Sequence, residues 1–186
     1  MKDLHRSLVV SSVLCVASLS GAAAVPSLPS NAQIRRGEYI VKANGCADCH
    51  APWRMGAQGP EPDLSRGLVG HPQEMAMPQP PKLEGPWLWL GAATNTAFAG
   101  PWGVSYASNL TPDPETGIGK WRPEDFIKAL RTGKHAGVGR PLMPPMPWPA
   151  YRNYSDGDLK AIYYYLFSRP AVKNRVPEYQ PPGGAR

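Results

Sequence analysis

The residues with the most specific chemistry are five consecutive ones, Cys46-Ala47-Asp48-Cys49-His50. C-x-x-C-H is the attachment signature of a c-type haem, in which two thiols add to the haem vinyl groups and the adjacent imidazole is held beneath the iron. Cys46 and Cys49 are therefore expected to carry the haem covalently, with His50 as the proximal iron ligand. The motif occurs once in the 186 residues, which predicts one haem.

Three other uses of these two thiols fit the sequence less well. A structural zinc site needs four ligands, and only His71 and His135 stand as distant candidates to complete one. A thioredoxin-type redox pair needs a βαβ context, for which there is no pattern here. A simple disulfide between Cys46 and Cys49 would make the neighbouring histidine a coincidence.

The sixth coordination position of the iron has several candidates. A soft thioether on a proline-stiffened turn is held in place without a helix, and Met/His ligation suits a cytochrome that only transfers electrons. This favours the turn that contains Met143 and Met146, while a methionine that is not a ligand is ordinary packing material. The full set of candidates comprises Met143, Met146, Met75, Met77, His71 and His135.

Three helices are expected to position these residues. Residues 32–44 follow a capping Asn31 and lead directly into the motif. A second helix is predicted over 122–132, where proline stands in the first turn and glycine follows the last. The clearest is the Asp158–Phe167 segment, because its apolar residues recur at i, i+3, i+4 and i+7 before a proline.

The region 52–102 and the C-terminus are dense in Gly and Pro, which prevents long helices. We expect residues 52–102 to form a long loop that wraps an apolar cofactor, although a partly disordered insertion over 66–86 is the alternative. Residues 170–186 are expected to form a loosely ordered tail. The covering surface of the loop would come from its tryptophans, Trp53, Trp87, Trp89 and Trp102.

Together these segments resemble class I c-type cytochrome domains. The similarity rests on C-A-D-C-H, on A-S-N-L-T-P-D-P-E-T-G-I-G-K-W at 107–121, on M-P-P-M-P-W-P at 143–149 and on the Asp158–Phe167 segment. It is greatest to the modules in cytochrome subunits of bacterial alcohol, aldehyde and sugar-acid dehydrogenases, and spans about residues 34–168 with a poorly matching loop at 52–93. Those subunits usually carry three such modules, whereas this chain carries one.

The resemblance implies an all-α, class I cytochrome c fold of three or more short helices around one haem. It also implies that Met146 is the distal ligand, with Met143 as the runner-up. In the family the proximal histidine ring bonds a loop carbonyl, for which Pro60 or Pro62 is the candidate here. The first and last helices are expected to cross, with Gly37 allowing a close approach to the region of Tyr163, Tyr164 and Tyr165.

Four further residues carry polar atoms that could contact the haem or its propionates. Each is equally well explained as a packed aromatic or a turn residue. The four are Trp102, Tyr106, Asn109 and Trp121.

The first 24 residues are typical of an export signal. Lys2 and Arg6 precede a mostly apolar stretch, and three alanines at 22–24 supply a small-residue cleavage site. An uncleaved membrane anchor is the alternative. The expected organisation is therefore a signal peptide at 1–24, a linker at 25–31 and a mono-haem domain at 32–169, in a periplasmic protein.

The chain has a formal charge of +6, and nucleic-acid binding is a poor explanation for this in an exported protein. A basic segment would steer docking to an acidic redox partner if it borders the haem edge, but a solvated helix face explains it equally well. Weak attraction to anionic lipid remains open. The basic residues are Lys120, Arg122, Lys128, Arg131, Lys134 and Arg140.

No catalytic constellation independent of the haem is recognisable, so we expect an electron-transfer protein and not an enzyme. Two alternatives stay open. One is a cytochrome subunit docked to a dehydrogenase or terminal reductase, which predicts an exposed apolar patch over 87–90. The other is a haem sensor or peroxidase-like protein in which Met146 does not hold the iron.

Overall fold

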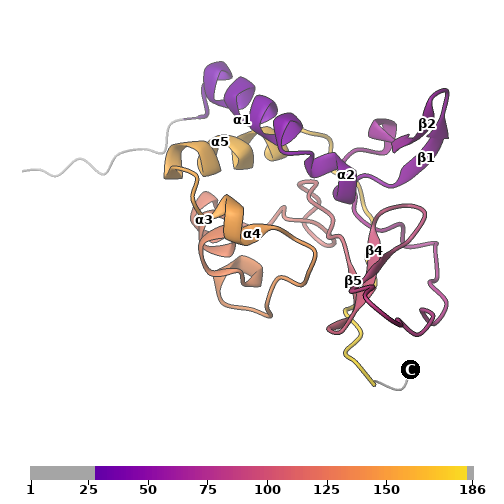
Figure 1. Ribbon diagram of the computed structural model, residues 1–186. Coiled ribbons are helices and arrows are strands. Elements are labelled where there is room, and N and C mark those ends of the chain that lie inside the picture. Colours follow the sequence, from indigo (N-terminus) through magenta and orange to yellow (C-terminus); the bar gives the residue numbers. More distant parts are fainter. Residues whose placement is uncertain (1–27, 184–186) are drawn as a thin grey trace, which may run out of the picture.

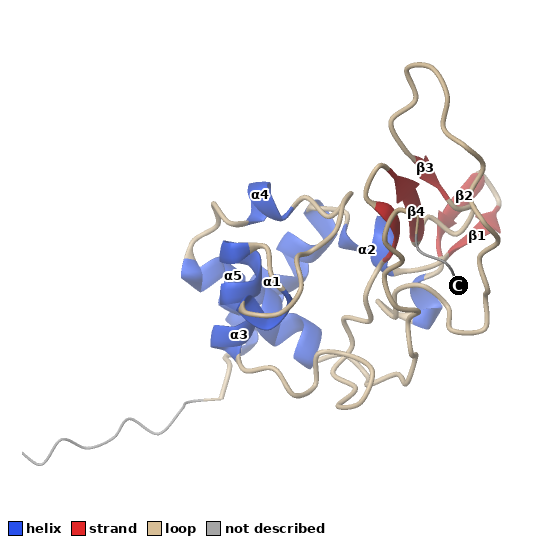
Figure 2. Cartoon of the chain, turned by 90° about the horizontal axis from the view of Figure 1, so that it is seen from below, coloured by secondary structure: helices blue, strands red, loops and turns tan. Residues whose placement is uncertain are grey.

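The computed structural model describes residues 28–183. The helices lie together on one side of the molecule and the strands on the other, with α2 between them (Figures 1 and 2). The predicted signal peptide and residues 25–27 of the predicted linker lie outside the described residues. Within those residues, no helix is long and apolar enough to cross a membrane.

In chain order the elements are α1 (Asn31–Ala43), α2 (Cys46–His50), β1 (Trp53–Gly56), β2 (Gly59–Pro62), the 3-10 helix η1 (Leu64–Arg66), β3 (Leu90–Gly91), β4 (Ala97–Gly100), β5 (Gly103–Tyr106), α3 (Pro123–Thr132), the 3-10 helix η2 (His135–Gly137), α4 (Trp148–Tyr151) and α5 (Asp156–Phe167).

The three helices expected from the sequence are α1, α3 and α5, and local capping sets their ends. Ser30, and not Asn31, caps α1: its hydroxyl accepts from the Gln33 amide while the Gln33 side chain accepts from the Ser30 amide. Ser155 caps α5 by accepting from the Asp158 amide at 3.1 Å. Helix α3 starts at a proline and ends at Gly133 in the left-handed conformation.

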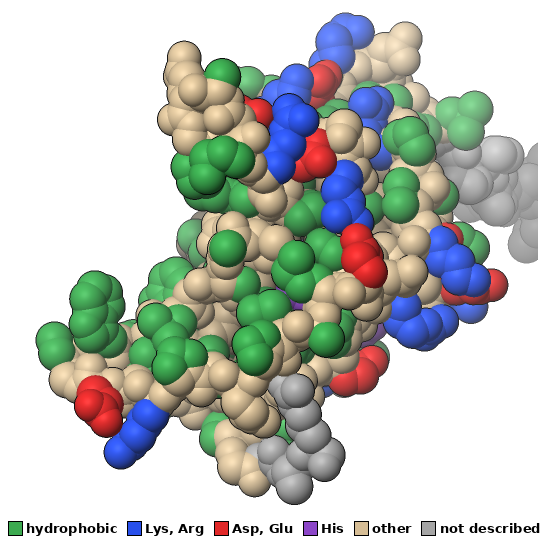
Figure 3. All heavy atoms as spheres, turned by 90° about the vertical axis from the view of Figure 1, so that its right-hand side faces the viewer, with side chains coloured by type: hydrophobic (Ala, Val, Ile, Leu, Met, Phe, Trp, Pro, Cys, Tyr) green, Lys and Arg blue, Asp and Glu red, His purple; other side chains and the backbone are tan. Residues whose placement is uncertain are grey.

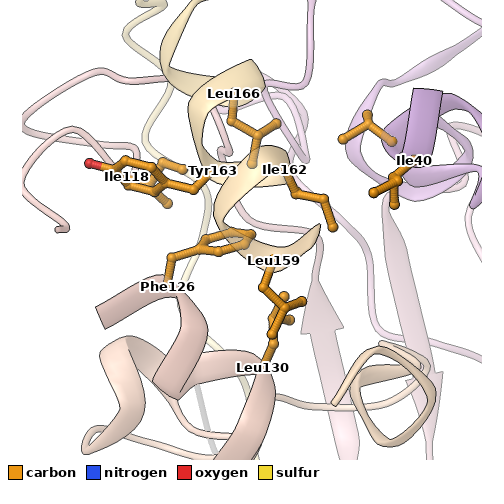
Figure 4. Packing of buried hydrophobic residues seen from close by; sticks show 9 residues of the cluster. Ile40, Ile118, Phe126, Leu130, Leu159, Ile162, Tyr163 and Leu166 are labelled. Atoms are coloured by element: carbon orange, nitrogen blue, oxygen red, sulfur yellow. The ribbon is translucent and has the colours of Figure 1, made fainter. Parts of the chain in front are cut away.

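Helices α1 and α5 cross in close contact. A Cβ atom built on Gly37 would lie 1.9 Å from the Ala161 carbonyl oxygen and 2.9 Å from the Tyr165 Cβ. Only glycine allows the two backbones to approach so closely. Around this crossing, side chains from α1, α3 and α5, with Ile118 from the loop before α3, form the apolar core that Figure 4 shows. Its buried members are Ile40, Val41, Ile118, Phe126, Leu130, Leu159, Ile162, Tyr163 and Leu166.

The expected all-α class was wrong, because the structure contains five strands. β1 pairs with β2, and β3, β4 and β5 form a second antiparallel sheet in that order. Four of the five strands fall within 52–102, where we expected one long loop. They have no more than four residues each and include Gly and Pro, so they lack the alternation of polar and apolar residues that marks a strand in a sequence.

The C-terminal segment differs from the expected loose tail. Asn174 is 4% exposed, and its side-chain amide donates to the carbonyls of Val69 at 2.7 Å and His71 at 2.9 Å. Gln180 then forms a β-bridge with Val104. Polar side-chain and backbone groups hold this segment against the domain, and a search for apolar periodicity does not detect such contacts.

Candidate cofactor site

The C-x-x-C-H motif forms one helical turn, α2, at the junction of the helical and strand regions. Gly45 precedes it in the left-handed conformation at φ 62°, which lets the chain turn sharply from α1 into the motif. His50 ends the turn with 9% of its surface exposed. The tight turn therefore brings both thiols and the imidazole to one place.

The His50 imidazole is oriented by the backbone of Ser108. Its Nδ1 lies 2.7 Å from the Ser108 carbonyl oxygen, and because a carbonyl only accepts, Nδ1 must carry the proton. Burial lowers the pKa of His50, which keeps the ring neutral at pH 7. Among the described residues Nε2 has no hydrogen-bond partner, so its lone pair is available to a metal.

The expected carbonyl partner of His50, from Pro60 or Pro62, was therefore wrong. Pro60 is an exposed residue of β2 and pairs with Met55 of β1. Ser108 follows β5, 58 residues beyond the histidine. Only tertiary packing brings it beside α2.

The two cysteines are free thiols in the structure. Burial raises the pKa of Cys46 to about 11, and burial also raises the pKa of Cys49. Redox and metal-binding cysteines act as thiolates and have lowered pKa values, so this environment does not favour thioredoxin-type exchange. Across residues 28–183, no group of three or more His, Cys, Asp or Glu side chains is placed to hold a metal ion.

A cavity of 580 Å³ opens next to α2, between the helical and strand regions. This volume falls within the range of about 300–1,000 Å³ that is common for small-molecule and cofactor sites. The cavity fits a haem bound through the motif, since both cysteines and His50 lie in its wall beside mainly apolar side chains. Lining residues from the rest of the fold include Val41, Phe98, Tyr106, Leu110, Ile118, Trp121, Phe126, Leu130, Leu142, Ile162 and Leu166.

Both methionines of the proline-rich turn line this cavity. The Met146 amide donates to the Met143 carbonyl at 3.2 Å, and Met146 also packs against the apolar core. His135 lines the cavity too and packs edge-on against Trp121. The structure therefore brings three of the six candidate distal ligands to the site.

The other three candidates, His71, Met75 and Met77, do not line the cavity. His71 is fully buried, with Nδ1 at 2.9 Å from Thr96 Oγ1 and Nε2 at 2.9 Å from the Met75 carbonyl oxygen. Because both of its nitrogens are engaged, His71 has a structural role.

No protein-family model matches the chain. Individual relatives do match it. The gluconate 2-dehydrogenase cytochrome c subunit of Pantoea cypripedii is 33% identical over 82% of the chain, which is 27% of the relative. The cytochrome c subunit of the quinone-type alcohol dehydrogenase of Gluconobacter oxydans is 28% identical over 96% of the chain, or 30% of the relative. The fructose dehydrogenase cytochrome subunit of Gluconobacter japonicus is 30% identical over 82% of the chain, and the match covers 26% of that protein.

The chain is related to the cytochrome c subunits of dehydrogenases. This confirms the resemblance inferred from the motifs, and the names of these relatives imply haem c as a cofactor. It also agrees with the expectation of an electron-transfer protein and not a catalytic subunit. The chain spans a third or less of each of these relatives.

Of the four residues expected to make polar contacts with the cofactor, three line the cavity: Tyr106, Asn109 and Trp121. Asn109 is 2% exposed, and its amide donates to the Val172 carbonyl at 2.8 Å, so it anchors the C-terminal segment. Trp102 does not line the cavity, and its indole donates to Ser105 Oγ. No local sequence pattern marks Ser108 or the residues at 175–179 that line the cavity, because their roles depend on contacts between segments far apart in the chain.

Ion pairs neutralise part of the basic segment. Arg122 pairs with Asp125, and Arg131 pairs with Asp156. The three lysines of the segment form no ion pair with any residue from 28 to 183. On the face of the molecule in Figure 3, hydrophobic side chains gather in the centre and lower left, whereas most Lys and Arg lie in the upper and right-hand parts.

Proposed function

We propose that this chain is a periplasmic mono-haem c-type cytochrome that transfers single electrons, with His50 and Met146 as the axial ligands of its iron. The observation that carries the proposal is the orientation of the His50 ring, whose Nδ1 is held by the Ser108 carbonyl and whose Nε2 has no hydrogen-bond partner among residues 28–183. Haem c, when bound, supplies a one-electron couple. The single C-x-x-C-H motif supports one haem, and residues 32–169 are the proposed domain.

The residues of the chain contribute position and environment. The Ser108 carbonyl fixes the tautomer and orientation of His50, and raises the basicity of Nε2. Cys46 and Cys49 provide the attachment points. Apolar lining from α3 and α5 excludes water, which raises the influence of nearby charges on the potential.

The assignment of Met146 is tested by comparing Met146→Ala with Met143→Ala in the haem-loaded protein. Removing the ligand should lower the reduction potential, change the visible spectrum and let the reduced form bind carbon monoxide. The Met143→Ala protein, changed at the other end of the same turn, should keep the wild-type spectrum and exclude carbon monoxide. The reverse pattern would assign the ligand to Met143, and carbon monoxide binding by the wild type would favour the sensor or peroxidase-like alternative.

Partnership with a dehydrogenase is the second part of the proposal. It is supported by the relatives that are named as dehydrogenase cytochrome subunits. It is also supported by three consecutive apolar residues with large exposed fractions, Trp87 at 73%, Leu88 at 63% and Trp89 at 41%. Trp89 also lines the cavity. An acidic docking face on the partner would complement the three unpaired lysines of the basic segment.

Replacing Trp87 and Leu88 with serine should weaken co-purification with a dehydrogenase while leaving the haem spectrum unchanged. The matched control is serine at Met55, which is 77% exposed in β1. Equal co-purification of all three proteins would contradict this docking surface. Export is checked separately, because N-terminal sequencing of the mature protein should begin at Val25.

A further inference from the structure

The C-terminal segment 172–180 crosses from the end of the helical region to the strands, as the yellow ribbon in Figure 1 shows. Its first anchor is Asn174, whose side chain also accepts from the Gln73 amide at 2.9 Å. Its second anchor is the paired backbone of Gln180 and Val104, with N–O distances of 2.8 and 2.9 Å. Next to that bridge, the Tyr179 hydroxyl donates to the Trp102 carbonyl. The segment is therefore fixed on both sides of its central residues.

Between these anchors the segment forms part of the cavity wall. Five consecutive residues line the cavity: Arg175, Val176, Pro177, Glu178 and Tyr179. The backbone of Arg175 is held further by its amide, which donates to Gln73 Oε1 at 2.8 Å. The position of Arg175 at the wall therefore does not depend on its own side chain.

The Arg175 guanidinium has no hydrogen bond or ion pair within residues 28–183. The nearby Glu115 carboxylate already holds Lys173 Nζ at 2.8 Å, and this contact is the main cause of its lowered pKa. Two arginines line the cavity, Arg140 and Arg175, and neither forms an ion pair with a carboxylate among residues 28–183. Of these two, only Arg175 lies on the anchored C-terminal segment. Arg175 therefore brings an unpaired planar cation to the cavity, which suits recognition of a carboxylate.

A haem carries two propionate carboxylates, which need charge-complementary partners when the ring is enclosed in protein. We propose that Arg175, held at the cavity by the anchored C-terminal segment, binds a haem propionate. This inference rests on the proposed haem function. It assigns a cofactor-binding role to a segment that follows the last helix of the domain.

The test compares the reduction potentials of haem-loaded wild type, Arg175→Gln and Arg175→Lys. A cation near the haem favours the ferrous form. Arg175→Gln should therefore shift the equilibrium between ferrous and ferric haem toward the ferric form by about threefold to tenfold. A tenfold shift corresponds to a decrease of about 59 mV in the reduction potential for one electron. Arg175→Lys should keep most of the wild-type potential. The matched control is Arg169→Gln, since Arg169 stacks on Tyr165 outside the cavity.

The outcomes separate this inference from the proposed function. Wild-type protein that attaches no haem would refute the proposed function itself. Normal wild-type protein with equal potentials for Arg175→Gln and Arg169→Gln would overturn only the role of Arg175. If Arg175→Gln prevents haem attachment, restoration by Arg175→Lys supports propionate binding, whereas failure of both variants overturns it in favour of a packing role.

Discussion

Substituting alanine for Gly37 tests how closely α1 and α5 pack. The new Cβ would lie 1.9 Å from the carbonyl oxygen and 2.5 Å from the carbonyl carbon of Ala161. Both atoms belong to the α5 backbone, which cannot move aside by changing a rotamer. Because ordinary contact begins at 3.4 Å, the two helices must separate locally by about 1.5 Å.

Such a separation affects the whole apolar core. A gap of about 0.5–1 Å already removes a quarter to a half of the dispersion attraction between atoms in contact. We expect a loss of about 3–5 kcal/mol from strain and disrupted packing, reduced by about 1 kcal/mol because alanine is the better helix former. The net expectation is a decrease of about 2–4 kcal/mol in the free energy of unfolding.

The measurement is guanidinium-induced unfolding of the haem-loaded protein, followed by far-UV circular dichroism. The matched control is Gly157→Ala in the first turn of α5, where a new Cβ would meet only Ser155 Oγ at 3.7 Å. This control should be as stable as the wild type or more stable by up to about 1 kcal/mol. A Gly37→Ala protein as stable as the control would refute the close helix contact.

Three further predictions concern polar contacts. Asn174→Ala removes three side-chain hydrogen bonds, two of them buried, and should lower the free energy of unfolding by about 2–4 kcal/mol. The control Asn153→Ala, at an exposed site, should cost about 0.5 kcal/mol or less. Equal losses in denaturant unfolding would contradict the anchoring role. Tyr163→Phe removes the hydroxyl that donates to the Trp121 carbonyl at 2.8 Å. Thermal unfolding should show a decrease of about 1 kcal/mol in the free energy of unfolding. An unchanged melting temperature would argue against this hydrogen bond. The hydrogen bond from Arg36 lowers the pKa of Asp158 below its ordinary value of 3.8. The stability that this pair contributes is therefore fully present above pH 3.8 and is lost as the pH falls through the lowered pKa. Wild-type protein should therefore lose more stability on acidification than Asp158→Asn, and parallel pH profiles would show that the pair contributes nothing.

Local signals predicted the helical part of the fold. The predicted helices correspond to α1, α3 and α5 because capping residues, prolines and apolar spacing act over a few neighbouring residues. The strands were not predicted, since β3 and β4 are too short to show a periodic pattern and contain glycine. The paired strands are neighbours in the chain, but the preference of a residue for a strand depends strongly on the contacts that the strand makes in the folded protein.

The sequence by itself determined the proposed attachment site: Cys46, Cys49 and His50 lie within five consecutive residues, so one helical turn is enough to bring them together. It also places the two proposed distal ligands together, because Met143 and Met146 share one proline-rich turn. Tertiary structure alone decided that Ser108 orients the histidine ring and that Arg175 reaches the cavity wall. Ser108 lies 58 positions beyond His50, and the segment that carries Arg175 is held by hydrogen bonds between residues about 100 positions apart. Such pairings exist only once the chain has folded.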